Sequence, residues 1–127
     1  MSMFHPVIEK DIKGVISVMG ADFHHLEGKN ILITGASGML ASYLVYTLIY
    51  ANKHILKKGA HLYLVIRKKA TPFGNNKYIH YLHKDIAKDK LGVRNIHYIV
   101  HAASKAAPKI YTRNMLDTLN TNILGLY

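Results

Sequence analysis

The length, composition and charge of the chain exclude several classes of protein. Its 127 residues suit one domain of ordinary size, and a hydrophobic content of 50% favours a packed core over disorder. Lys and Arg outnumber Asp and Glu by 17 to 7, a formal net charge of +10. The basic residues are scattered and do not alternate with aromatic ones, so we expect no nucleic-acid partner.

The chain also lacks the usual signs of export and of metal binding. It has no cysteine, which excludes disulfides and thiolate metal sites. Its longest apolar run, residues 39–51, is shorter than the about 20 residues that cross a bilayer. Residues 1–13 do not resemble a signal peptide. The histidine pairs 24/25 and 80/83 have no acidic partner at a metal-binding spacing. We therefore expect a cytoplasmic protein with no membrane partner and no metal site.

The first predicted element is a helix over residues 6–19. Apolar residues recur there at helical spacing, Pro6 suits a first turn, and Gly20 suits the position just past the end. We interpret residues 1–29 as a helical extension that packs on the outside of a domain formed by residues 30–127.

Strands and helices alternate after this extension. The runs 31–34 and 61–67 are apolar without alternation, as in strands buried on both faces of a parallel sheet. Between them, helical spacing continues to about Asn52. Residues 71–76 form a loop, 78–82 a third strand, 85–91 a short helix or turn, 96–100 a fourth strand, and 110–126 a helix. The pattern predicts an α/β fold with a parallel sheet of about four strands in the order 3-2-1-4 and flanking helices.

The glycine-rich stretch after the first strand carries the chemistry. Gly35 permits a tight turn, Gly38 lets a phosphate approach the backbone, and Ala41 is small enough for helix and strand to pack closely. Main-chain N–H groups at the helix start, near Ser37 to Leu40, would bind the anion. The alternative is a plain strand–turn–helix corner that needs glycine only for backbone reasons.

Five segments in order resemble the extended short-chain dehydrogenases/reductases, the NAD-dependent epimerases and dehydratases of nucleotide sugars. Thr34–Ala41 is similar to their TGxxGxx(G/A) signature. The other four segments are Leu64–Arg67, His83–Ile86, Val100–Ser104 and Thr121–Gly125. The resemblance implies a Rossmann-type fold, NAD or NADP as cofactor, a nucleotide-sugar substrate in the intact enzyme, and hydride transfer at the sugar's C4.

The resemblance also implies the site residues. The cofactor would be held by Gly35, Ser37, Gly38, Met39, Leu40, Arg67, Lys68, Asp85, Ile86, Ala102, Ala103 and Ser104. Asn122 matches a supporting active-site residue of the family. Each assignment has an alternative: Arg67 and Lys68 accommodate the 2′-phosphate of NADP or are simply solvated, Asp85 caps the following turn, and Asn122 bonds a strand.

Three departures from the family pattern are present. Ala41 replaces a third glycine, and Arg67 lies 32 residues after Gly35, farther than usual. No tyrosine has a lysine four positions on, so the catalytic Tyr-x-x-x-Lys pair is absent. We interpret the chain as a truncated, N-terminal portion of the enzyme; the alternative is a non-catalytic dinucleotide-binding or scaffold protein. The last strand, left without a neighbour, predicts self-association through an exposed sheet edge.

Overall fold

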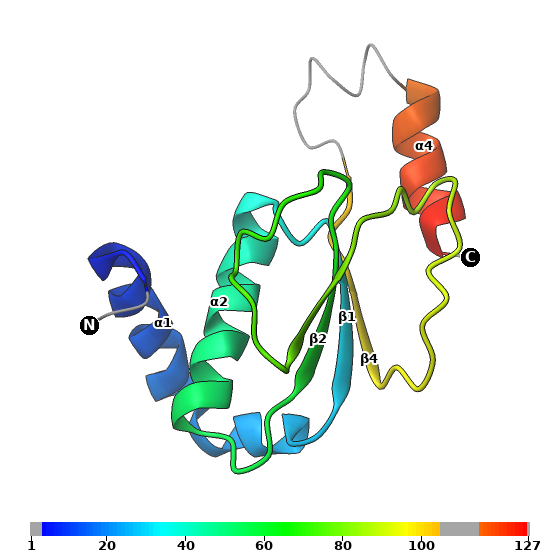
Figure 1. Cartoon of the computed structure of the whole chain (residues 1–127). Helices are drawn as coiled ribbons and strands as arrows, with labels where there is room; N and C mark the ends of the chain where they lie inside the picture. Colours follow the sequence, from blue (N-terminus) through cyan, green and yellow to red (C-terminus); the bar gives the residue numbers. More distant parts are fainter. Residues whose placement is uncertain (1–3, 105–114, 127) are drawn as a thin grey trace.

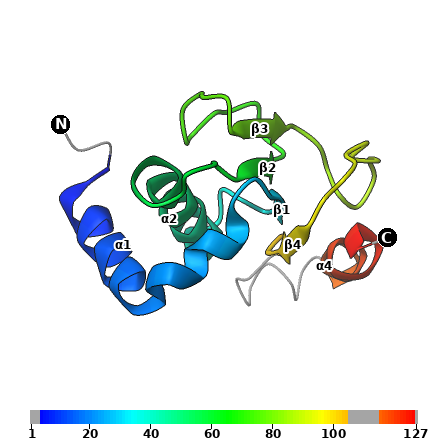
Figure 2. The same ribbon diagram turned by 90° about the horizontal axis from the view of Figure 1, so that it is seen from below.

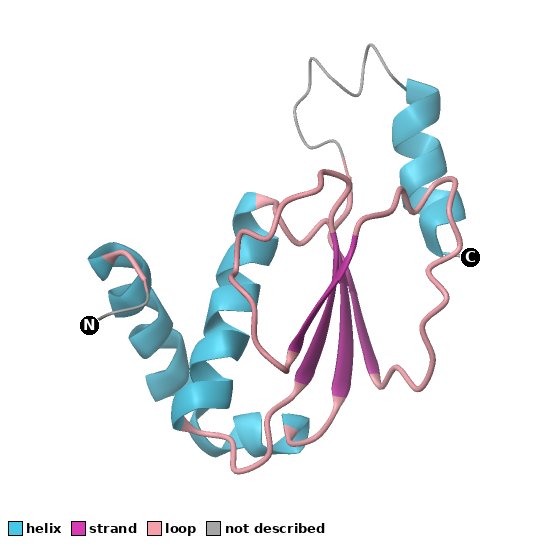
Figure 3. Ribbon diagram, viewed as in Figure 1, coloured by secondary structure: helices cyan, strands magenta, loops and turns pink. Residues whose placement is uncertain are grey.

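The computed structural model describes residues 4–104 and 115–126 (Figure 1). A helical N-terminal part, α1 (Pro6–Met19) and the 3-10 helix η1 (Gly20–Leu26), precedes the alternating elements (Figure 3). These are β1 (Asn30–Thr34), α2 (Met39–His54), β2 (His61–Val65), β3 (Ile79–Leu82) and β4 (Tyr98–His101), followed by α4 (Met115–Ile123) and η2 (Leu124–Leu126). No helix in these described ranges is long and apolar enough to cross a membrane.

The four described strands form one parallel sheet in the order β3-β2-β1-β4, which confirms the predicted order. In the register, Leu32 of β1 pairs with Tyr63 of β2 on one side and with Ile99 of β4 on the other. Since parallel strands all run in one direction, their carboxyl ends meet at one end of the sheet. The segments that follow β1, β2, β3 and β4 therefore emerge close to one another.

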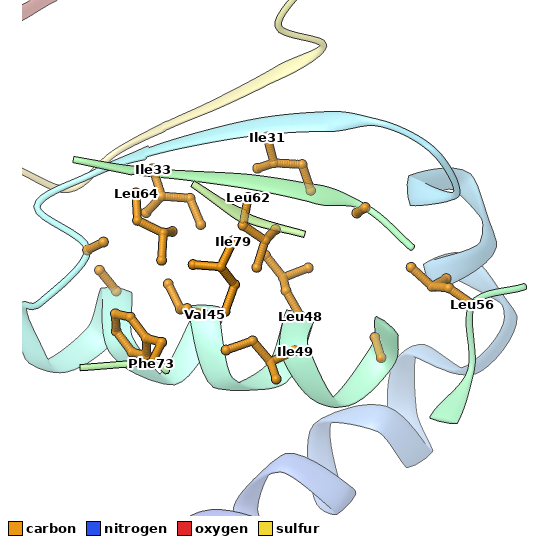
Figure 4. Close-up of a cluster of buried hydrophobic side chains, with 14 of the residues drawn as sticks. Ile31, Ile33, Val45, Leu48, Ile49, Leu56, Leu62, Leu64, Phe73 and Ile79 are labelled. Atoms are coloured by element: carbon orange, nitrogen blue, oxygen red, sulfur yellow. The ribbon is translucent and has the colours of Figure 1, made fainter. Parts of the chain in front are cut away.

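One face of the sheet is covered by α2, and the main core lies between them. Side chains from three strands meet those of the helix there, as Figure 4 shows for Ile31, Ile33, Leu62, Leu64, Ile79, Val45 and Leu48. α1 packs outside α2, and Phe23 of η1 belongs to the core cluster. The predicted outer helix over residues 6–19 is confirmed. Its helical spacing turns Ile12 toward the rest of the domain, and this residue is only 1% exposed to solvent.

The opposite face of the sheet, called the far face below, is covered by fewer packed side chains than the face under α2. Side chains alternate along a strand, so Leu32, Tyr63, His80 and Ile99 form one row across this face. The connection from β3 to β4, residues 83–97, contains no helix and only a turn at 86–88. Figure 2 shows α1 and α2 on one side of the sheet, and this connection with α4 on the other. Ile99 remains 64% exposed.

Some element boundaries differ from those predicted. α2 runs to His54, two residues farther than predicted, and β4 begins at Tyr98, where its pairing with Ile31 of β1 starts. Residues 85–91 adopt the turn rather than the helix: the Asp85 carboxylate accepts the N–H of Ala87 at 3.0 Å, which closes an Asx-type turn. Of the predicted helix 110–126, residues 110–114 lie outside the described residues, and the remainder is α4 and η2.

Candidate functional site

The turn that joins β1 to α2, Gly35–Gly38, requires glycine at its first position for two independent reasons. Gly35 has a φ of 63°, in the left-handed region that residues with a Cβ rarely adopt. A Cβ on Gly35 would also lie 2.7 Å from the N and Cα atoms of Ala103. The turn is closed by the N–H of Gly38, which donates to the carbonyl of Gly35 at 3.0 Å. The end of β4 can therefore touch this glycine turn.

The helix that follows begins with unshielded main-chain donors. Gly38 is the N-cap of α2, no side chain caps this end, and the first intrahelical bond is from Ser42 N–H to Gly38 O at 2.8 Å. The N–H groups of Met39, Leu40 and Ala41 thus have no partner within the helix. Ser37, Gly38, Met39 and Leu40 are all exposed, and α2 has no acidic residue in its first turn.

This arrangement fits a diphosphate group. A Cβ on Gly38 would meet only the carbonyl oxygen of Gly35, at 3.2 Å, so the side of the turn where a side chain would stand is open. A phosphate can approach the backbone there and accept hydrogen bonds from the helix N-terminus, whose dipole favours an anion. The predicted residues Gly35, Ser37, Gly38, Met39 and Leu40 all lie in this one place.

Thr34 joins the glycine turn to the end of β4. Its carbonyl accepts the N–H of Ala102 at 3.2 Å, and its Oγ1 accepts the N–H of Ala103 at 3.3 Å. Oγ1 also lies 2.9 Å from Nδ1 of His101, the residue that pairs with Thr34 in the sheet. The predicted residues Ala102 and Ala103 are therefore held against the turn, and Ser104 follows them, exposed.

The sequence analysis did not predict the hydrogen-bonded pair of Thr34 and His101. It follows from the β1–β4 register, and the only signal in the sequence was a hydroxyl residue and a histidine at the ends of two strands. Thr34 Oγ1 thus bonds both Ala103 N–H and Nδ1 of His101, and the other nitrogen of the ring is Nε2. That Nε2 is buried and has no hydrogen-bond partner among the described residues.

Arg67 and Lys68 lie beside the glycine turn. They follow β2, and the N–H of Ala36 reaches the carbonyl of Val65 at 3.4 Å, which ties the turn to the end of that strand. Both side chains are exposed, and within the described ranges neither takes part in an ion pair. Two positive charges are thus available to an anionic group near the turn.

The other predicted residues are less closely associated with the turn. One carboxylate oxygen of Asp85 accepts the N–H of Ala87, as expected of a capping residue. Ile86 is half-buried and packs toward η2, where a Cβ on Gly125 would lie 2.6 Å from its Cδ1. Asn122 is exposed on α4, and no hydrogen bond within the described residues connects it to the turn. Its supporting role stays a prediction.

The comparisons with known proteins give a family. Among curated proteins and among solved structures, the searches find no match. A family model described as "NAD dependent epimerase/dehydratase family" matches residues 31–127. This match begins in β1 and includes the glycine turn and every predicted site residue, and the family implies a nicotinamide dinucleotide cofactor. The chain belongs to the NAD-dependent epimerase/dehydratase family.

Proposed function

We propose that the chain is the cofactor-binding part of an enzyme that oxidises a nucleotide sugar at C4 and passes the hydride to NAD+ or NADP+. The observation that carries the proposal is the exposed glycine turn, with open space over Gly38 and unpaired N–H groups at the start of α2. The family match and the resemblance of the later segments to nucleotide-sugar enzymes support the substrate class.

Cofactor and protein have different tasks in the proposed reaction. When bound, the nicotinamide ring supplies the hydride acceptor. The N–H groups near Met39 and Leu40 bind the diphosphate, and Thr34 holds Ala102 and Ala103 against the turn, where they would pass beneath the cofactor. No Tyr-x-x-x-Lys pair occurs in the 127 residues, so this chain lacks the general base that takes the hydroxyl proton. We therefore expect binding without turnover.

Arg67 and Lys68 support tolerance of NADP+. No acidic residue occurs between His61 and Leu82, so no carboxylate there can accept the ribose 2′-hydroxyl or repel a 2′-phosphate. The exposed guanidinium of Arg67 follows the strand that lies next to the turn, where a 2′-phosphate would be expected. A charge-assisted contact at this position would favour NADP+.

Titration calorimetry with NAD+ and with NADP+ tests the binding site. Gly38→Val places a side chain where the diphosphate approaches, and binding should be lost. Gly14→Val is the matched control, because a Cβ on Gly14 meets nothing within 4 Å and the residue lies on α1. Equal affinity in the parent and Gly38→Val would exclude the glycine turn as the site.

Incubation of the chain with several nucleotide sugars and NAD(P)+ tests the expected lack of turnover. The parent should form no product although it binds the cofactor. Sustained product formation would show that a catalytic base exists within these residues.

A further inference from the structure

We propose that His61 and His80 form a two-histidine site for a divalent transition-metal ion, Cu²⁺ or Ni²⁺, on the far face of the sheet. Nδ1 of His61 and Nε2 of His80 lie 3.0 Å apart. Two nitrogens that bind one metal at about 2.0–2.1 Å, with an angle of about 90–110° between them, are separated by about 2.9–3.4 Å. The observed separation falls within that interval.

The sheet register holds the two rings in this arrangement. Tyr63 pairs with His80 across β2 and β3, so His61, two residues before Tyr63, lies on the same face and diagonally beside His80. The His61 and His80 rings are stacked, with an interplanar angle of 23°. The ring of Tyr63 stacks on that of His80, with 4.6 Å between the ring centroids. The ring of Tyr78 contacts that of His61 edge-on, at 5.3 Å between centroids. Both imidazoles are thus pre-oriented by aromatic contacts.

The site is accessible and chemically suited to a metal. Both histidines are half-buried rather than enclosed, and the β3–β4 connection lays no helix over this face. Imidazole nitrogens suit Cu²⁺ and Ni²⁺, and Cu²⁺ binds most strongly along the first-row series.

Solvent would complete the coordination sphere. Within residues 4–104 and 115–126, no three His, Cys, Asp or Glu residues are placed to hold one metal ion. The site is also separate from the glycine turn: His61 begins β2, paired with the first residue of β1, about 13 Å along the strand from Thr34. A bound metal would connect the outer strand β3 to β2.

Calorimetric titration of the purified chain with NiCl₂ and with CuCl₂ at neutral pH tests the proposal. The parent should bind one equivalent and melt at a higher temperature with the metal present, because a ligand of the folded state stabilises it. His61→Gln and His80→Gln should each lose this binding and the shift in melting temperature. His54→Gln is the matched control, since His54 is exposed on α2, and it should bind as the parent does.

A spectroscopic measurement on the parent avoids dependence on the folding of the variants. Electron spin echo modulation of one equivalent of Cu²⁺ counts the coordinating imidazoles, and we expect two. One imidazole, or binding that survives both substitutions, would overturn the proposal and leave the pair as a histidine–histidine hydrogen bond only.

Discussion

Replacing Gly35 with alanine is the sharpest test of the contact between the glycine turn and the end of β4. The new residue must adopt a φ of 63°, which costs an L-residue about 1–2 kcal/mol. Its Cβ would also lie 2.7 Å from Ala103 N and Cα and 2.8 Å from Ala102 C, whereas non-bonded carbons prefer about 3.5–4.0 Å. These are backbone atoms, so relief requires β4 to move away from β1.

That movement has an additional cost. It stretches the hydrogen bonds from Ala102 N–H to Thr34 O and from Ala103 N–H to Thr34 Oγ1, now 3.2 and 3.3 Å long. At about 0.5–1.5 kcal/mol each, their loss adds about 1–3 kcal/mol. The total for Gly35→Ala is then about 2–5 kcal/mol, a large share of the stability of a domain of this size.

Urea denaturation followed by circular dichroism measures this loss against a matched control. Gly74 has a φ of 72° but nothing within 4 Å of its Cβ position, so Gly74→Ala incurs the backbone cost alone, about 1–2 kcal/mol. The difference between the two variants isolates the contact with β4. Equal losses in free energy of unfolding would refute the close approach of the turn to Ala103.

Three further predictions concern charge, pH and association. Arg67→Asp should weaken NADP+ binding more than NAD+ binding, by about 1–3 kcal/mol in the difference, while Lys10→Asp on α1 should leave the ratio unchanged in calorimetry. Because His80 has a lowered pKa in the fold, chiefly through burial and then through His61, the unfolded chain binds more protons below about pH 6.5. Stability should therefore fall as pH drops through this range, and His80→Gln should reduce the fall; an identical pH dependence in both proteins would contradict this. We also propose that β4, the outermost strand on its side of the described sheet, mediates self-association, so Ile99→Lys should lower the mass measured by light scattering at high concentration. A parent that stays monomeric at that concentration would show that the edge is covered.

The sequence alone determined most of the segments that form strands and helices, where the glycine turn lies, and which family the chain resembles. These features depend on local properties. Apolar runs without alternation predicted β1 and β2, and helical spacing predicted α1 and α2. The positive φ of Gly35 depends on one residue type, glycine, which is read directly from the sequence. The basic residues after β2 could also be assigned from the sequence, because they directly follow a strand that the apolar run predicts.

The tertiary structure decided the contacts between residues distant in sequence. In the sequence His80 stands three residues from His83, but the register of β2 and β3 pairs His80 with Tyr63 and places His61 diagonally beside it. Thr34 meets His101 and Gly35 meets Ala103 for the same reason: relative strand position is set by how whole apolar faces pack against α2, and no local pattern encodes it. Between β3 and β4 the sequence left a helix and a turn as alternatives, and the structure has the turn, closed by the Asp85 carboxylate.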